Sequence, residues 1–204
     1  MKNGMKIVAI VIVAGSLTTL WAGKKDKKLI TKEPMMSEAM MNAMKHGSPS
    51  ENHKMLEPLI GNWTAEVKGW MEPNGKVEES KGLAKNWWVL GGRFVQEEFK
   101  GDWAGQPFEG MGLIGYDNIR GQYESIWLDN FMTGMMKFSG KYDATTKTFS
   151  SDGDFSCPMT GEKNKWARTE TKIIDNDNHV YLSYSKGPDG KEFKNMEITY
   201  KRVK

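Results

Sequence analysis

The hydrophobic period of the chain changes once, near residue 61, and this change constrains the fold more than any other feature. Before it, apolar residues recur at helical spacing. After it, Trp63, Ala65 and Val67 alternate with the polar residues Thr64 and Glu66. Successive side chains of a strand point to opposite faces, so alternation of this kind predicts a half-buried β-strand.

The same alternation recurs to the end of the chain, interrupted by turn signals rich in glycine, proline, asparagine and aspartate. These turn signals are GG (91–92), WAGQP (103–107), DNIRG (117–121), DATT (143–146), DNDN (175–178) and KGPDG (186–190). They divide the sequence into about ten short strands with no helical period between them. We expect an all-β fold, a single up-and-down antiparallel β-barrel of about ten strands, because closure leaves no exposed sheet edge.

One or two short helices are expected before the barrel. In the clearer one, residues 48–61, Ser48 is a good N-cap, Pro49 suits the first helical position and Gly61 ends the helix. The other lies in a methionine-rich segment, where the thioethers fall at helical spacing: Met36, Met40, Met41 and Met44. We interpret it as an amphipathic helix, with a Cu(I) site helped by His46 as the weaker alternative.

Closure of the barrel would place the first and last strands side by side. On the last strand, Met196 and Arg202 belong to the inward face, and Phe193 and Asn195 belong to the outward face. An inward Arg202 would then stack over Trp63 and plug the end of the barrel below the preceding helix.

The sequence resembles a known superfamily at this point. A short helix, a G-x-W and a late arginine are typical of the lipocalin and fatty-acid-binding (calycin) proteins. Residues 46–203 are similar to the bacterial family catalogued as domain of unknown function 1579. The matching stretches are HKMLEPLIGNW, LGGRFVQEEFKG, PFEGMGLIGYD, YESIWLD, SGKYD and FKNMEITYKR. The resemblance implies a lipocalin-like barrel over residues 48–204 and supplies no established activity.

The N-terminal residues have the pattern of a secretory signal peptide over residues 1–23. Lys2 and Lys6 precede an uncharged apolar run, residues 7–22, which is shorter than a membrane span needs. Residues 24–47 would follow as a polar, Met-rich segment. We expect a periplasmic or secreted protein with no stable membrane insertion after cleavage; an uncleaved anchor is the alternative.

Charge and cysteine content exclude several classes of function. The chain has 29 basic and 26 acidic side chains, a formal net charge of +3, which gives no reason to expect nucleic acid as a partner. Cys157 is the single cysteine, so no intrachain disulfide can form. The three histidines are scattered and no metal motif is present, so we predict no metal site and no cofactor.

Two further patterns are interpreted as structural. Gly110-Met111-Gly112-Leu113-Ile114-Gly115 fits G-x-G-x-x-G, but a strand rather than a helix is expected after it, which argues against a dinucleotide site. The acidic pair Glu97–Glu98 is interpreted as solvated surface.

Parity of charged neighbours predicts which side chains face the barrel interior. The predicted ligand-binding set is Trp88, Tyr123, Trp127, Asp129, Met136, Phe138, Thr169 and Met196. An aromatic lining with a few polar groups suits a small hydrophobic or amphipathic molecule, although the same rings could simply fill the barrel. We expect binding rather than catalysis and assign no catalytic residue; the oligomeric state is left open.

Two alternative functions remain at the sequence level. Asp129, if inward, could have a raised pKa and act as a general base, but it lies where its strand ends and could equally cap a turn. His179 begins a late strand and is the one candidate in the barrel for a haem ligand.

Overall fold

The computed structural model describes residues 36–204. The predicted signal peptide, residues 1–23, and the start of the polar segment therefore lie outside the described residues. The described helices are α1 (Glu38–Gly47), α2 (Glu51–Lys54) and the 3-10 turn η1 (Glu57–Leu59). None of the helices within residues 36–204 is both long and apolar enough to cross a membrane.

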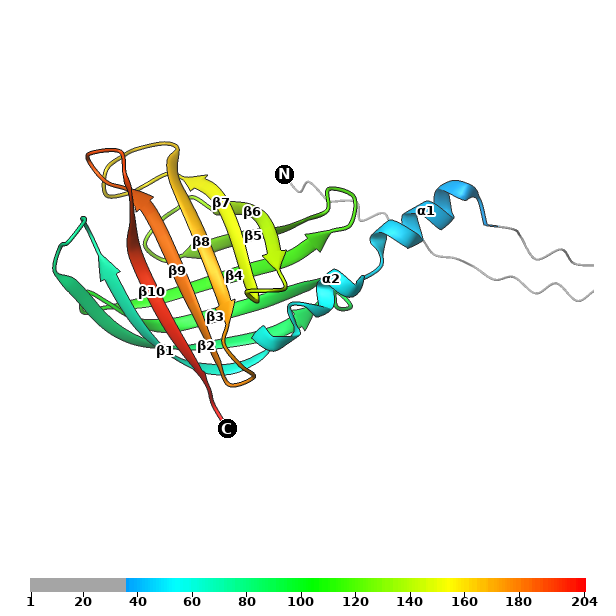
Figure 1. The fold of residues 1–204 in the computed structure, drawn as a ribbon, viewed down its shortest axis with the longest axis horizontal. Helices are drawn as coiled ribbons and strands as arrows, with labels where there is room; N and C mark the ends of the chain where they lie inside the picture. The colour runs from blue at the N-terminus through cyan, green and yellow to red at the C-terminus, as the bar shows by residue number, and fades with distance from the viewer. Residues whose placement is uncertain (1–35) are drawn as a thin grey trace, which may run out of the picture. The chain divides into compact units, whose positions relative to one another are not determined.

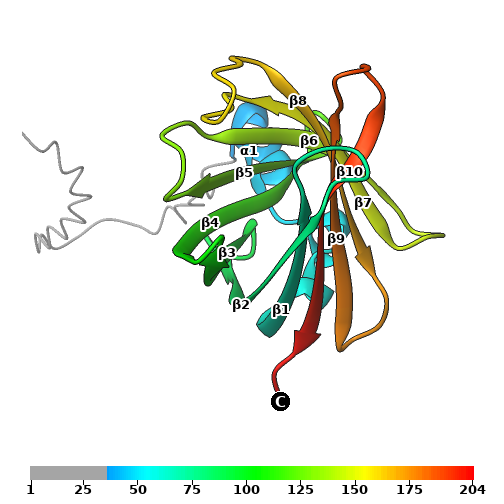
Figure 2. The same ribbon diagram turned by 90° about the vertical axis from the view of Figure 1, so that its left-hand side faces the viewer.

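Ten antiparallel strands follow the helices and form one closed barrel (Figure 1). They are β1 (Gly61–Trp70), β2 (Val77–Val89), β3 (Phe94–Trp103), β4 (Gln106–Asp117), β5 (Gln122–Asp129), β6 (Met136–Asp143), β7 (Thr148–Phe155), β8 (Lys165–Ile173), β9 (Asn178–Lys186) and β10 (Glu192–Arg202). Each strand pairs with the next along the chain, and β10 pairs with β1, as Figure 2 also shows. The predicted all-β, up-and-down barrel of about ten strands is confirmed.

The two ends of the barrel differ because the strands alternate in direction. The turns β2–β3, β4–β5, β6–β7 and β8–β9 lie at the same end as the helical segment, which enters β1 there. The turns β1–β2, β3–β4, β5–β6, β7–β8 and β9–β10 lie at the other end. We call the first the closed end and the second the mouth.

The helix before β1 is shorter than the sequence suggests, and its cap is Ser50 rather than Ser48. The amide of Ser50 donates to Nδ1 of His53 at 3.0 Å, which makes a capping box with histidine in place of glutamate. His53 is buried, so this capping hydrogen bond is shielded from solvent. Ser48 instead donates its hydroxyl to the carbonyl of Met44 and ends α1. A separate 3-10 turn, η1, begins at Glu57 and contains Pro58, which lacks the amide donor that a continuous α-helix would use.

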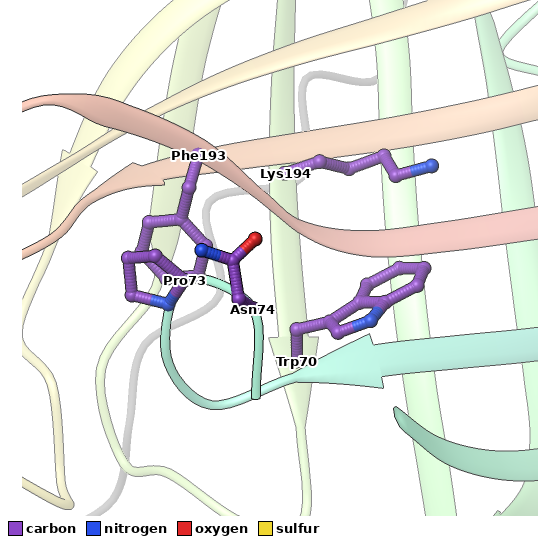
Figure 3. A pocket seen from close by; sticks show the side chains of 5 residues that line it. All are labelled: Trp70, Pro73, Asn74, Phe193 and Lys194. Carbon is purple, nitrogen blue, oxygen red and sulfur yellow. The ribbon is translucent and has the colours of Figure 1, made fainter. Parts of the chain in front are cut away.

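A β-bulge in β10 corrects the predicted faces of that strand. The register with β9 shifts between Lys194 and Met196, so one extra residue stands at Asn195. Side-chain parity reverses across a bulge, and both Phe193 and the extra residue Asn195 line the cavity instead of facing outward as the sequence predicted. Figure 3 shows Phe193 beside Pro73, and Lys194 above the Trp70 ring, around a small hollow at the mouth. The Lys194 Nζ atom lies 4.9 Å from the centroid of that ring.

A hydrophobic cluster seals the closed end. Leu56 and Leu59 of the helical segment are buried against Val95, Tyr123 and Phe149 from the strands. Leu56 is fully buried, and the burial of a leucine side chain contributes about 1.5–3 kcal/mol. The helical segment is thus part of the barrel core and closes this end.

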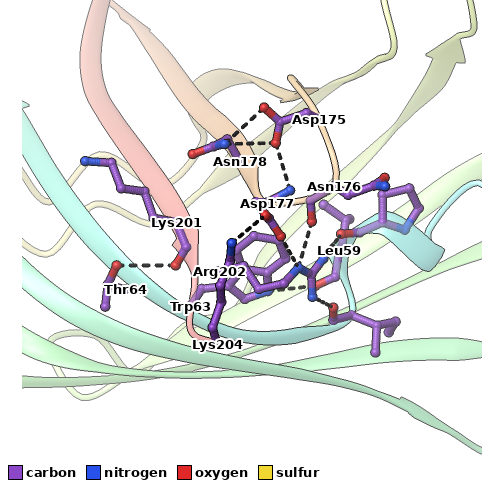
Figure 4. Close-up of polar contacts among 12 residues, drawn as sticks. Leu59, Trp63, Thr64, Asp175, Asn176, Asp177, Asn178, Lys201, Arg202 and Lys204 are labelled. Atoms are coloured by element: carbon purple, nitrogen blue, oxygen red, sulfur yellow. Dashed lines mark hydrogen bonds and ion pairs between the residues drawn. The ribbon is translucent and has the colours of Figure 1, made fainter.

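Arg202 and Trp63 face each other across the β1–β10 seam (Figure 4). The guanidinium lies 4.1 Å from the centroid of the indole ring. It donates to the carbonyl oxygens of Ile60 at 2.6 Å, Pro58 at 3.1 Å and Asn176 at 2.7 Å. The carbonyl groups at the end of a helical segment have no partners within it, and here one side chain satisfies two of them.

Replacement of Arg202 by lysine should lower the free energy of unfolding by about 1–3 kcal/mol, because a single ammonium cannot reproduce the planar set of donors. Chemical denaturation of purified protein measures the loss. The matched control is Lys201→Met, which removes the neighbouring exposed cation that pairs with Glu66, and it should change stability by less than about 0.5 kcal/mol. Equal effects of the two substitutions would contradict the role given to Arg202.

Candidate functional site

The barrel encloses a cavity of about 630 Å³. It extends from Leu59 at the closed end to the turns at the mouth. The apolar part of the wall is dominated by Trp103, Phe108, Trp127, Phe131, Met132, Met136, Phe138 and Met196. A cavity of this size matches the 300–1,000 Å³ of typical small-molecule sites. The interior is therefore not filled by its own side chains.

Six of the eight predicted interior residues line this cavity: Trp127, Asp129, Met136, Phe138, Thr169 and Met196. The other two, Trp88 and Tyr123, belong to the cluster that seals the closed end. There the Trp88 indole donates to Glu57 at 2.7 Å, and the Tyr123 hydroxyl donates to the carbonyl of Asn52 at 2.8 Å. For these eight residues parity gives the correct face of the strand, but it does not give the height along the barrel, which decides whether a side chain meets the cavity or the helical segment.

The G-x-G-x-x-G stretch lies within β4, so it has no helix N-terminus to offer a pyrophosphate. Two of its glycines make room for the ring of Trp127 on the neighbouring strand. A Cβ atom at Gly110 would lie 2.2 Å from the Trp127 ring, and one at Gly112 would lie 3.2 Å from it. These glycines let a large indole lie flat against the wall of the cavity.

Asp129 is held by two hydrogen bonds. One carboxylate oxygen accepts from the Trp127 indole at 3.0 Å, and the other accepts from the amide of Phe131 at 2.9 Å. The second bond is the turn cap that the sequence analysis weighed against base chemistry. With both oxygens engaged in fixing the wall and the turn, the geometry does not favour a general base at this position.

His179 is packed between two aromatic rings at the closed end. Its ring stacks on Tyr200 at 4.3 Å and meets the edge of Trp63 at 4.4 Å. Only 4% of the residue is exposed, and burial, aided by the charge of Arg202, lowers its pKa to about 3. A haem iron needs an open coordination position in front of a ring nitrogen, and this enclosure does not fit one.

The methionine side chains of α1 are exposed to solvent. Met36, Met40, Met41 and Met44 are about half exposed, and no residue of the helix is buried. No cluster of three His, Cys, Asp or Glu side chains suited to a metal occurs within residues 36–204. Met40, Met41 and Met44 of α1 are not among the residues that line the barrel cavity.

Glu97 is the functional candidate that sequence reasoning missed. The pair Glu97–Glu98 was interpreted as solvated surface, which is wrong for its first member, because consecutive strand residues point to opposite faces. Glu97 lies on the inward face of β3 with its apolar neighbours Val95 and Phe99, and it lines the cavity. The apolar residues two positions away on each side were the sequence signal for this orientation.

The Glu97 carboxylate meets a group of aromatic and polar side chains near the closed end. The Tyr200 hydroxyl donates to it at 3.3 Å, and Asn86 stands beside it on β2. No ion pair among the described residues includes Glu97. Removal from bulk water raises the pKa of Glu97 to about 7, and the Tyr200 hydrogen bond opposes this only in part. The partly accessible surface of Glu97 faces the cavity.

Unpartnered polar atoms lie along the cavity, on β2, β9 and β10, from the closed end to the mouth. Five buried side-chain atoms within residues 36–204 have no hydrogen-bond partner: Ser80 Oγ, Asn86 Oδ1, His179 Nδ1, Ser185 Oγ and Asn195 Oδ1. All five belong to residues that line the cavity. A buried polar group without a partner costs about 1–3 kcal/mol, so their concentration here is a feature that a bound molecule would explain.

The comparisons with known proteins can now be set beside this geometry. A family described as "Protein of unknown function (DUF1579)" matches residues 48–202. The chain belongs to this family. The resemblance noted in the sequence is therefore confirmed, and the family description adds no activity. No curated protein sequence matches the chain.

Two solved structures share the barrel of this DUF1579 protein. Rv2717c from M. tuberculosis is 15% identical, with a TM-score of 0.59 over 77% of this chain and 100% of that chain. The S-type phycobiliprotein lyase CPES from Guillardia theta is 12% identical, with a TM-score of 0.53 over 78% of this chain and 96% of that chain. At these identities the likeness shows the fold alone.

The stability of the ligand-free protein should depend on pH through Glu97. A carboxyl group with a raised pKa in the folded state contributes stability below its ordinary pKa of 4.5, and that contribution is lost as the pH rises through about 7. Between about pH 5 and pH 8, wild type should lose about 1–3 kcal/mol relative to Glu97→Gln. Urea denaturation across this range measures the difference. The exposed neighbour supplies the control, since Glu98→Gln should keep the wild-type slope, and a Glu97→Gln slope identical to wild type would refute the assignment.

Proposed function

We propose that this protein binds a small hydrophobic or amphipathic molecule inside the barrel. The observation that carries the proposal is the cavity of about 630 Å³, whose wall is largely aromatic and aliphatic with polar groups set along its length. This combination is typical of ligand sites: apolar area supplies affinity and a few polar groups orient the ligand.

The mouth has the character of an entrance for such a ligand. Three of its lining residues, Met71, Phe131 and Met159, are 43–66% exposed although they are large and apolar. They lie at the end of the barrel opposite the helical segment. A hydrophobic molecule that leaves water would meet apolar surface before it enters.

The comparisons contribute the fold to this proposal. The similar structure from Guillardia theta is a phycobiliprotein lyase, so a barrel of this architecture supports at least one named activity. The likeness at 12% identity does not transfer that activity, and the proposal rests on the cavity of this chain.

A tryptophan placed inside the barrel should abolish binding. Ser125 lines the cavity, and Ser125→Trp would occupy much of it, whereas Ser139→Trp places the same side chain on the exposed outer face. Titration with N-phenyl-naphthylamine, a neutral apolar fluorophore, should show binding to wild type and Ser139→Trp and at least a tenfold weaker affinity for Ser125→Trp. Circular dichroism verifies that each variant is folded. The proposal fails if wild type binds no fluorophore and native mass spectrometry finds no retained small molecule.

We further propose that residues 1–23 direct export, so that the barrel works in the periplasm or outside the cell. The support is the sequence pattern alone: two lysines followed by an uncharged apolar run. Expression of the full chain in a Gram-negative host should give periplasmic protein whose mass corresponds to a start near Lys24. Recovery of the intact chain from the membrane fraction would favour the uncleaved anchor instead.

A further inference from the structure

The closed end of the cavity presents hydrogen-bond acceptors that the protein leaves unused. Glu97 supplies a carboxylate, and Asn86 supplies an amide oxygen whose partner nitrogen is already committed to the carbonyl of Leu59 at 3.0 Å. Asn86 is 6% exposed and lines the same cavity as Glu97, and its amide oxygen is enclosed. A ligand that filled this end would therefore need to donate hydrogen bonds.

The charge at this end is also uncompensated. Glu97 has no ion-pair partner among residues 36–204, and its one protein donor is the Tyr200 hydroxyl. An ionised carboxylate in an apolar cavity is costly unless it is paired, because it has lost its water. A cation brought by the ligand would remove that cost.

From this arrangement we propose that the cavity binds an amphipathic amine, with its protonated amino group on Glu97 and its apolar part along the aromatic wall towards the mouth. This inference rests on the function proposed above and names the chemical class of the ligand. The ammonium would donate to the Glu97 carboxylate and to Asn86 Oδ1. The apolar part would lie against Phe108, Trp127 and Met136.

Among the titratable groups at the closed end of the cavity, Glu97 is the one that changes its charge near neutral pH. Tyr200 and Tyr181 have pKa values raised by burial and by the nearby carboxylate, and burial keeps His179 neutral. The remaining charged residues on the cavity wall are Asp102, Asp129 and Lys165. Arg202 does not line the cavity; its guanidinium lies over the Trp63 ring. Ionisation of Glu97 increases as the pH rises through about 7, so amine binding should strengthen over the same interval.

Three ligands with one alkyl chain test the proposal: decylamine, decanol and decanoate, each below its critical micelle concentration. Competition with N-phenyl-naphthylamine gives their affinities for the full-length protein. At about pH 8 wild type should bind decylamine at least about tenfold more tightly than decanol, and decanoate most weakly, and at about pH 6 the preference for the amine should shrink.

Glu97→Gln keeps the shape of the side chain and removes its charge. It should still bind the fluorophore and decanol, and it should lose the preference for the amine at both pH values. Glu98→Gln, on the exposed outer face, should keep the wild-type preference.

The outcomes separate the two proposals. Equal binding of decylamine and decanol to wild type, a preference for decanoate, or an amine preference retained by Glu97→Gln overturns the amine assignment and leaves the ligand-binding barrel standing. If neither the fluorophore nor any of the three chains binds wild type, the proposed function fails and the amine assignment fails with it.

Discussion

The contact between Arg202 and the carbonyl groups that end the helical segment is the interaction on which the rest of the structure depends. A helical turn leaves its last carbonyl oxygens without partners, and burial of such a group is costly. Here the barrel supplies the donors: Arg202 for Pro58 and Ile60, and the Trp63 indole together with Asn86 for Leu59. One set of bonds therefore satisfies the segment, fixes it across the barrel and joins the last strand to the first.

The seal at one end determines what the other end can do. Because Leu56 and Leu59 seal the closed end of the barrel, the interior is a cavity that opens only at the mouth. Ten strands enclose more space than the inward side chains fill, and unfilled apolar volume costs stability. The cavity wall also carries five unpartnered buried polar atoms and a carboxyl group, Glu97, whose pKa is raised by removal from bulk water. Unfilled apolar volume and unpartnered polar groups both destabilise a protein core, whereas a bound ligand could fill the first and pair with the second.

Aromatic side chains have two distinct roles in this barrel, and height along the strand separates them. Near the closed end, Tyr123 and Trp88 use their polar atoms to hold the helical segment. Farther along, Trp127 lies against glycines of the adjacent strand and forms part of the cavity wall. Asp129 then fixes both the Trp127 indole and the turn after it, so a residue that the sequence offered as a candidate general base has a positioning role.

The sequence by itself determined the strand count, the closure of the barrel and the face of most strand residues, because alternation with a period of two is a local property of the backbone. It also contained the signal for Glu97, between Val95 and Phe99, although that signal was outweighed by the adjacent Glu98. Only the tertiary structure decided which inward residues meet the cavity. Trp88 and Trp127 both point inward, but Trp88 packs in the cluster at the closed end and Trp127 lines the cavity. It alone placed the bulge at Asn195, which reversed Phe193, because a bulge is set by pairing with a distant strand and leaves no local period. Asn86 lies beside Glu97 only because β2 pairs with β3, and the unpartnered atoms of β9 and β10 join the same cavity only in the closed barrel, so no single segment of the chain carries this arrangement.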